Sequence, residues 1–341
     1  MKAIMKIRFL QAVIGIVFGC MICFGGGMDA QAIELRLSHH LPPTAIPAKA
    51  LEQWAKRLET ETNGGVKITI FPSETLAKGR DAYTSTAAGV CDIAFVNNVY
   101  EPSRWGLNNI VGQISLAIPT DQRGGQFWDQ LWKKYPEMLK EFEGVHVFAR
   151  TISGSIALHT KKMVRVPADI KGMKIAAMGE SLKLLRSVGA SPVGIPAGDW
   201  YMSLEKGMME GVLCPINVLT DRGVEEILPF HVDLGMGQNG NVIIINLSRW
   251  NSLQPDIKAK FEGLNQWTTD LIIKALDDVA AEGWKKCRDR GQTIIKPTPE
   301  ESKLWLAHSE PLVEDWIKIN EKKGPTREMF EYAKKLREEI H

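Results

Sequence analysis

The sequence predicts an α/β protein made of two strand-and-helix units and one long helix. Two stretches, 33–96 and 145–215, alternate short apolar strands with amphipathic helices. In the first stretch the order strand, helix, strand, helix, strand is typical of a doubly wound parallel sheet. A third stretch, 255–290, keeps helical spacing of its apolar residues throughout. At 1.5 Å per residue, a helix of about 35 residues reaches roughly 50 Å, which exceeds the width of one small domain, so we expect it to run under both units.

Each element is predicted from residue period and from stop signals. Period-two alternation predicts strands at 33–38 and 66–71, and a nearly continuous apolar run predicts a central strand at 91–96. Helices are expected between these strands, at 47–61 and 80–88. The remaining expected strands are 145–149, 156–159, 174–177, 193–195, 211–215 and 242–245, and the remaining helices are 181–188, 199–209, 255–290 and two or three more within 298–341.

The first 32 residues have the pattern of a secretory signal peptide. Basic residues precede an apolar run, 9–24, that ends in glycines and the small-residue site 30–32. A transmembrane anchor is the alternative, but the run is shorter than the roughly twenty residues that span a bilayer. A lipoprotein attached at Cys20 or Cys23 is a weaker alternative, because no clear Leu-x-x-Cys box is present. We expect export to the periplasm, cleavage near Ala32 and no membrane insertion of the mature chain.

Composition excludes several classes of protein. With 341 residues, 44% of them apolar, and 42 Lys+Arg against 40 Asp+Glu, the chain is neither disordered nor fibrous. It has no basic block of the kind that marks a nucleic-acid-binding surface. Beyond residue 32 only Cys91, Cys214 and Cys287 remain, an odd number without metal-site spacing. We therefore expect neither a disulfide framework nor a metal site.

Motifs of catalysis and of nucleotide binding are absent from the sequence. It contains no nucleophile elbow, no zinc-protease helix signature, no Walker motif and no dinucleotide glycine pattern. A nucleophilic Cys214 would need a histidine that lowers its pKa, and the sequence places none beside it. His39 and His40 are adjacent, so on an extended chain they point to opposite sides and do not form a metal pair. One histidine that hydrogen-bonds in a ligand pocket is the better interpretation.

Polar residues follow the ends of the expected strands. His40 comes after the first strand, and Asn97 and Asn98 come after the third. In open α/β sheets ligands bind just beyond the carboxyl ends of strands. Trp200, which follows a helix-capping Asp199, is expected to form one wall of the same cleft. These residues are the candidate binding site from sequence alone.

Several segments resemble the solute-binding proteins of tripartite ATP-independent periplasmic (TRAP) transporters, the DctP-like family. The clearest segment is 166–175, which reads Val-Pro-Ala-Asp-Ile-Lys-Gly-Met-Lys-Ile. Further matching segments follow in the same order as in the family, at 61–65, 76–80, 88–94, 188–193, 204–215 and 245–253. No single motif is decisive, but six further segments in register with the first are specific.

The resemblance implies a two-lobed periplasmic binding protein fold, with a long helix spanning both lobes. Lobe I would comprise 33–154 with 241–281 returning to it, and lobe II 155–240 with 282–341 packing on it. The cleft between them would close on a small organic acid and deliver it to the membrane subunits of a TRAP permease driven by an ion gradient. No enzymatic activity, cofactor or ATPase partner is implied. The alternatives are a receptor of an ATP-driven importer, a periplasmic enzyme and an added sensor role.

One departure from the family concerns the ligand. The family usually has an arginine directly after the Gly-x-Lys-x segment, where it forms a two-pronged pair with the ligand carboxylate, and here that position is Ala176. Either Arg150, Arg104 or His40 supplies the cation instead, or the ligand is not a simple monocarboxylate. A wall formed by Met178, Cys214 and Trp200 would suit a larger or aromatic ligand. The expected ligand-binding residues are His40, Asn97, Asn98, Arg150, Ala176, Trp200, Cys214, Asn217 and Gln238.

Overall fold

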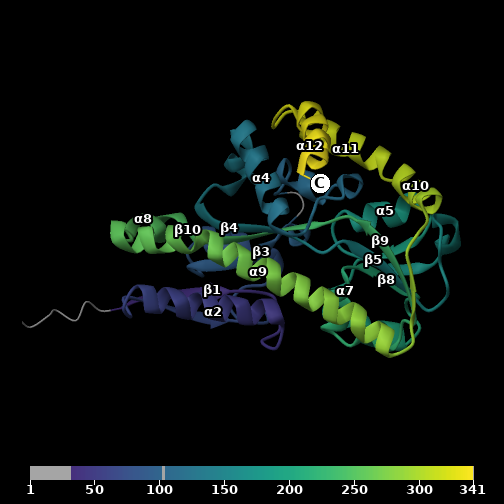
Figure 1. Cartoon of the computed structure of the whole chain (residues 1–341), viewed down its shortest axis with the longest axis horizontal. Coiled ribbons are helices and arrows are strands. Elements are labelled where there is room, and N and C mark those ends of the chain that lie inside the picture. Colours follow the sequence, from purple (N-terminus) through teal and green to yellow (C-terminus); the bar gives the residue numbers. More distant parts are fainter. Residues whose placement is uncertain (1–31, 102–103, 341) are drawn as a thin grey trace, which may run out of the picture.

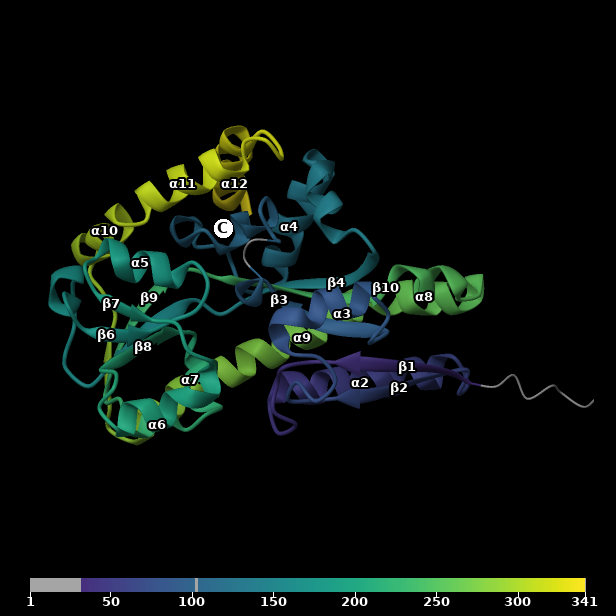
Figure 2. The same cartoon turned by 180° about the vertical axis from the view of Figure 1, so that it is seen from behind.

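Two α/β lobes lie side by side in the computed structural model, each built on its own sheet (Figures 1 and 2). The structure describes residues 32–101 and 104–340, so the expected signal peptide lies, apart from Ala32, outside the described residues. Within those two ranges, no helix combines the length and the apolar character that a bilayer crossing requires. The predicted fold class, α/β with two lobes and a long shared helix, is confirmed.

Lobe I is built on a five-stranded sheet in the order β2-β1-β3-β10-β4. The strands are β1 (Ile33–Ser38), β2 (Val66–Phe71), β3 (Ile93–Asn97), β4 (Val145–Ser153) and β10 (Asn239–Asn246). As predicted, β1 pairs in parallel with β2 and β3, whereas β10 is antiparallel to both of its neighbours, β3 and β4. The antiparallel direction arises because β10 enters this sheet from the other lobe. The lobe's helices include α2 (Ile46–Glu61), α3 (Ala82–Ala87), α4 (Gln122–Lys134) and α8 (Leu247–Ser252).

Lobe II is built on a six-stranded sheet in the order β11-β9-β5-β8-β6-β7. The strands are β5 (Ile156–Thr160), β6 (Lys174–Ala176), β7 (Ser191–Val193), β8 (Gly211–Cys214), β9 (Phe230–Met236) and β11 (Thr293–Ile295). Its short helices are α5 (Ser181–Ser187), α6 (Trp200–Glu205) and α7 (Ile216–Thr220). Strands β9 and β11 were not predicted: β11 has only three residues, whereas β9 alternates apolar and polar residues from Phe230 to Met236, a period-two pattern that is typical of a strand.

The chain crosses between the lobes next to the recess described below. One crossing joins β4 to β5 and the other joins β9 to β10. The Ile156 N–H donates to the Gly237 carbonyl at 3.1 Å, so the two crossings lie side by side. Gly237 has φ +67°, a conformation that residues with a side chain rarely adopt. The boundaries expected at 154/155 and 240/241 stay our proposal for where the lobes divide.

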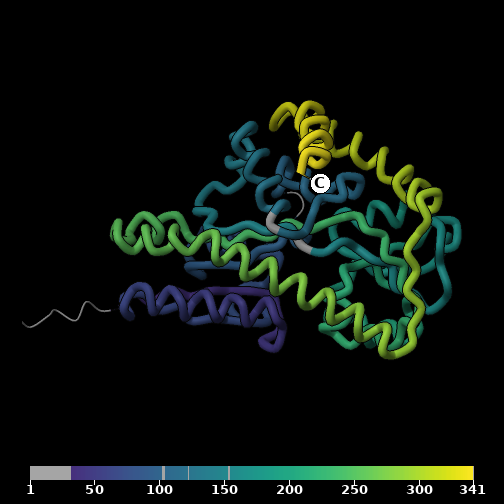
Figure 3. Tube along the Cα trace, in the orientation of Figure 1, coloured from purple at the N-terminus to yellow at the C-terminus, as the bar shows by residue number. Residues whose placement is uncertain are grey.

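The long helix α9 (Pro255–Asp289) runs from one lobe to the other as a single element (Figure 3). It packs on α2 and β4 in lobe I and on α7 in lobe II. Its two interior glycines differ in their surroundings: a Cβ at Gly263 would meet open space, whereas one at Gly283 would lie 3.0 Å from Ile216. Gly283 is therefore a point of close contact between α9 and α7.

The C-terminal helices pack differently from the expectation that 282–341 lies on lobe II. The helices are α10 (Pro299–Ala307), α11 (Glu310–Asn320) and α12 (Thr326–Ile340), drawn in yellow in Figure 1. Trp305 of α10 is buried in the core of lobe II, but Trp316 of α11 is buried in that of lobe I, where its indole N–H donates to the Gly106 carbonyl at 2.7 Å. Helix α12 packs on α4. The expectation is wrong for α11 and α12 because their apolar faces fit lobe I.

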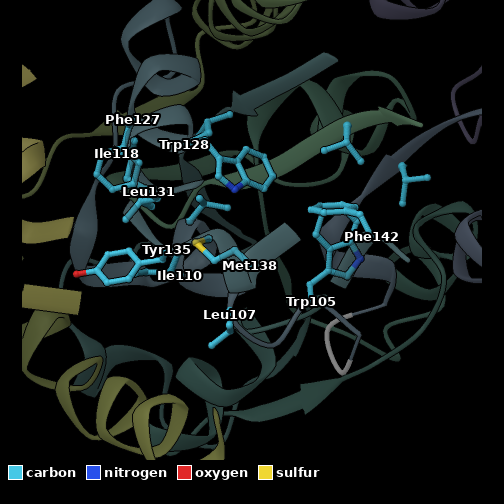
Figure 4. Packing of buried hydrophobic residues seen from close by; sticks show 14 of the residues in the cluster. Trp105, Leu107, Ile110, Ile118, Phe127, Trp128, Leu131, Tyr135, Met138 and Phe142 are labelled. Carbon is cyan, nitrogen blue, oxygen red and sulfur yellow. The ribbon is translucent and has the colours of Figure 1, made fainter. Parts of the chain in front are cut away.

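The cluster that receives α11 and α12 is rich in aromatic rings (Figure 4). Trp105 meets Phe142 edge to face with ring centroids 5.0 Å apart, and its centroid lies 6.4 Å from that of Trp128. Such pairs stabilise a core beyond the burial of their area. This cluster packs on one face of the first sheet, which holds β3 and β4 in place beside the recess.

Candidate functional site

A recess opens where the two lobes meet, and residues from both lobes line it. Lobe I contributes residues that follow β1 and β3, lobe II contributes residues from the end of β8 and from α7, and α9 contributes Leu276. The space between these walls measures about 860 Å³ when the open solvent at its mouth is included. The position agrees with the rule that ligands bind beyond the carboxyl ends of strands.

The wall from lobe I is aromatic and neutral. The His40 ring lies between Phe95 and Tyr100, with ring centroids 5.9 and 4.9 Å away. Burial in the recess, together with the charges of His39 and Arg222, lowers the pKa of His40 to about 3, so the ring is neutral at pH 7. His39 is buried and does not line the recess, and its Nδ1 accepts from the Leu41 N–H at 3.2 Å. Only His40 of this pair is therefore a lining residue.

Asn97 lies at the same wall and is held by the protein. Its amide Nδ2 donates to the Asn241 side-chain oxygen at 2.8 Å, and its own oxygen accepts from the Val99 N–H at 3.0 Å. These bonds fix the amide plane, so Asn97 presents its remaining N–H in one orientation.

The wall from lobe II combines Trp200, Cys214 and Asn217. The Trp200 indole N–H donates to the Ile195 carbonyl at 3.2 Å, so its polar atom is already satisfied and it offers the recess apolar surface. Burial raises the pKa of the Cys214 thiol, which keeps it protonated. His159 hydrogen-bonds the Cys214 backbone carbonyl at 3.2 Å rather than the thiol. A protonated thiol is a poor nucleophile, so this geometry does not support a catalytic cysteine.

Sequence reasoning missed several polar lining residues, among them Tyr100, Asp221, Asn241 and Arg222, and Arg222 is the cation among them. It follows α7, and its Nη1 donates to the Val218 carbonyl at 3.0 Å. Within residues 32–101 and 104–340, no carboxylate oxygen lies within 4.0 Å of its guanidinium nitrogens. A signal was present in the sequence, since Arg222 lies four residues after Val218 and five after Asn217, on the short segment that follows β8.

Asn98 and Gln238 line a smaller adjoining hollow of about 350 Å³. The Asn98 amide donates to Asn109 at 3.0 Å and accepts from the Gly240 N–H at 3.1 Å, while the Gln238 oxygen accepts from the Ile118 N–H at 3.1 Å. Both side chains therefore hold backbone near the crossing between the lobes. The hollow shares Val99, Met178 and Asn239 with the main recess, so the two spaces adjoin.

Three other expected positions lie outside the recess. Ala176 is fully buried in the core of lobe II. Arg150 pairs with Asp129 and has its guanidinium carbon 5.0 Å from the Trp132 ring. Arg104 pairs with Glu101 at 2.9 Å and covers the Tyr83 ring. The expectation that Arg150 or Arg104 supplies the cation of the site is therefore corrected, because both guanidinium groups are committed to other partners.

A recess between two α/β lobes, joined by crossing strands and a shared helix, defines a binding protein of the two-lobed periplasmic class. The sequence model of DctP, described as bacterial extracellular solute-binding protein, family 7, matches residues 37–319. The chain therefore belongs to the DctP family of solute-binding proteins. No group of three or more His, Cys, Asp or Glu side chains that could hold a metal ion occurs in the described parts of the chain.

Named relatives and solved structures agree with this family. The C4-dicarboxylate-binding periplasmic protein DctP of Rhodobacter capsulatus is 19% identical over 304 residues, which cover 81% of this chain and 84% of that protein. A TRAP solute binding protein from Rhodoferax ferrireducens, solved with copurified benzoate, has a TM-score of 0.82 at 20% identity and covers 91% of this chain and 98% of its own. One from Bordetella bronchiseptica, solved with (R)- and (S)-mandelate, has a TM-score of 0.80 at 22% identity and covers 91% and 100%.

Proposed function

We propose that this protein is the extracytoplasmic receptor of a TRAP-type secondary transporter. It binds a small organic acid in the recess between its lobes and delivers it to the membrane subunits of the permease. The N-terminal segment 1–32 directs its export, and cleavage near Ala32 releases the mature chain into the periplasm. No chemical step is part of this function.

The observation that carries the proposal is the composition of the recess. Both lobes contribute polar side chains to it, and one cation, Arg222, borders it without a carboxylate within 4.0 Å in the described residues. A partly buried cation is stabilised by an anion that joins it there. The ligands named for two related structures, benzoate and mandelate, are organic carboxylates, the class of ligand that we propose for this recess.

Thermal unfolding of the mature chain, 33–341, tests the binding step. We expect that one class of organic acid raises the unfolding temperature, because a ligand at a hundredfold over its dissociation constant stabilises the folded state by about 2.7 kcal/mol. Mass spectrometry of the recovered ligand serves as the control, and it should find the acid unchanged. Conversion of the ligand would contradict a receptor and favour an enzyme.

Uptake by proteoliposomes tests the delivery step. The liposomes carry the membrane subunits of a TRAP permease from the same organism, with the loaded receptor added outside. We expect uptake that requires the receptor and an ion gradient and proceeds without ATP. Uptake that depends on ATP and a different permease would replace the proposal with the ATP-driven alternative.

A further inference from the structure

We propose that Arg222 binds the carboxylate of the ligand, and that the ligand is an aromatic monocarboxylate rather than a dicarboxylate or a sugar acid. This inference rests on the proposed function, which it makes specific. Arg222 thus takes the role that an arginine at position 176 would have.

The first step of the argument concerns the hydrogen-bond donors of Arg222. A guanidinium carries five N–H donors in a flat fork, and Arg222 uses one nitrogen, Nη1, to donate to the Val218 carbonyl. The fork matches the two oxygens of a carboxylate. The two arginines that the sequence suggested for this role, Arg104 and Arg150, lie outside the recess and already have carboxylate partners. Arg222 is therefore the arginine placed to receive an anion from outside the chain.

The second step locates the charge of Arg222 within the recess. That charge acts on His40 and Tyr100 of lobe I and on Cys214 of lobe II, and in each case it favours the form with less positive charge. The guanidinium thus lies near groups of both lobes. A carboxylate bound to it would also meet the His40 ring, which is neutral and carries one N–H donor.

The third step limits the ligand to one carboxylate. The other charged side chain that lines the recess is Asp221. Burial raises the pKa of its carboxyl group, and the nearby charges of Arg222 and Lys286 offset only part of that rise. A second carboxylate on the ligand would share the recess with the carboxyl group of Asp221. Among the described residues, no cation other than Arg222 lines the recess to bind it. Like charges at close range favour exclusion of such a ligand.

The fourth step assigns the body of the ligand to an aromatic ring. The remaining lining includes Phe95, Val99, Met178, Trp200, Leu213 and Leu276. The polar atom of Trp200 is bonded to Ile195, and both ends of the Asn97 amide already have partners. The polar lining residues Ser181, Asn217 and Asn239 could bond some hydroxyl groups of a sugar acid, but each hydroxyl group left against the apolar side chains would be costly. A flat ring fits between aromatic walls and gains favourable ring contacts.

Isothermal titration of the mature chain with five probes tests the proposal: benzoate, phenylacetate, benzamide, succinate and glucuronate. We expect benzoate or phenylacetate to bind at least about tenfold more tightly than the neutral benzamide, succinate or glucuronate. Affinity for the aromatic acid should stay constant from pH 6 to 9, because a guanidinium group is charged throughout this range and His40 stays neutral. Tighter binding of succinate or glucuronate would overturn the aromatic assignment.

Variants at Arg222 test its role directly. Arg222→Gln should weaken binding of the aromatic acid by about 10- to 100-fold, and Arg222→Lys, which keeps the charge without the fork, should lose less. The control is Arg290→Gln, an exposed arginine of the same lobe that pairs with Glu226, and it should bind as the wild type does. Unfolding temperatures without ligand show whether each variant is folded. If Arg222→Gln does not fold, Arg222→Lys still tests the role of the guanidinium fork.

The outcomes separate this inference from the proposed function. If the wild type binds an organic acid and both Arg222 variants bind it equally well, the role of Arg222 is wrong while the receptor function stands. If proteoliposome uptake needs the receptor but carries only neutral compounds, the carboxylate assignment fails. If no organic acid of any class binds the wild type, the proposed function itself fails.

Discussion

At the scale of single residues, the interior holds several histidines that are neutral when the protein is folded. Burial lowers the pKa of His39 to about 4, and burial also lowers the pKa values of His159 and His231. The His159 and His231 rings meet through their Nδ1 atoms at 2.8 Å beneath the recess. Each ring takes up a proton more readily once the chain unfolds, because an exposed histidine has a pKa near 6.5. Stability must therefore depend on pH.

The sign of that dependence follows from proton binding. Below about pH 6.5 the unfolded chain binds more protons than the folded one, so the free energy of unfolding falls as pH falls from 6.5 toward 4. We expect urea unfolding midpoints to drop between pH 7 and pH 5. His39→Asn should reduce this slope, since one such ring is removed, and its midpoint at pH 7.5 gives the intrinsic cost of the substitution. Midpoints that rise on acidification would contradict the neutral state of these rings.

Part of the recess follows from local sequence rules and part does not. His40 and Asn97 were found because they directly follow strands that period and apolar runs predict. Arg222 was missed because its place depends on how α7 packs on α9, a contact between residues about sixty apart in sequence. Arg150 was expected to supply the cation of the site, but it lies in β4 opposite Val242 of β10 and pairs with Asp129, outside the recess.

At the scale of elements, the contact between α7 and α9 sets the position of Asn217 and Arg222. Gly283 allows α9 to approach α7 closely, and a Cβ there would lie 3.0 Å from Ile216 and 3.1 Å from Thr220. Gly263, on the same helix, faces open space and is exposed. Substitution of Gly263 therefore changes helix propensity alone, whereas the same substitution at Gly283 also changes the packing of α9 on α7.

Alanine at each glycine should have opposite consequences. Gly263→Ala should raise the free energy of unfolding by about 0.5–1 kcal/mol, because alanine stabilises a helix interior relative to glycine. At Gly283 the same gain is offset by crowding against α7, so this variant should be less stable than Gly263→Ala and should bind the ligand more weakly. Denaturant unfolding and titration calorimetry measure both effects. Equal stability and equal affinity of the two variants would show that α7 does not depend on this contact.

Long elements with a clear period were predicted more reliably than short or terminal ones. Helix α9 was predicted at 255–290 and spans Pro255–Asp289, since its apolar residues keep helical spacing throughout. The three-residue strand β11 gives too short a pattern to recognise. The lobe on which α11 and α12 pack is not encoded by their own amphipathic pattern, because any apolar face of sufficient width satisfies it.

At the scale of the whole molecule, the lobes are joined by two crossing strands, by α9 and by the α10–α11 segment. Trp305 anchors α10 in lobe II, and Trp316 anchors α11 in lobe I, so the short junction between these helices spans the two lobes. Helix α9 and this junction therefore connect the two lobes in addition to the crossing segments. Closure of lobes about such connections is the usual response of two-lobed receptors to their ligands.

Lobe closure gives the last prediction. Cysteines placed at Lys56 of α2 and Lys206 beyond α6, both exposed and in different lobes, carry a donor and an acceptor dye, while Cys91, Cys214 and Cys287 are buried and stay unlabelled. We expect a saturating aromatic acid to shift the population toward one distinct energy-transfer state, because the ligand contacts both walls of the recess and binds the closed form better. Arg222→Gln at the same acid concentration should remain in the unliganded distribution, since it lacks the fork that links the carboxylate of the ligand to lobe II. An unchanged distribution in the wild type, with binding shown by calorimetry, would mean that the recess takes its ligand without closing, and the permease would then have to recognise the loaded receptor by another feature.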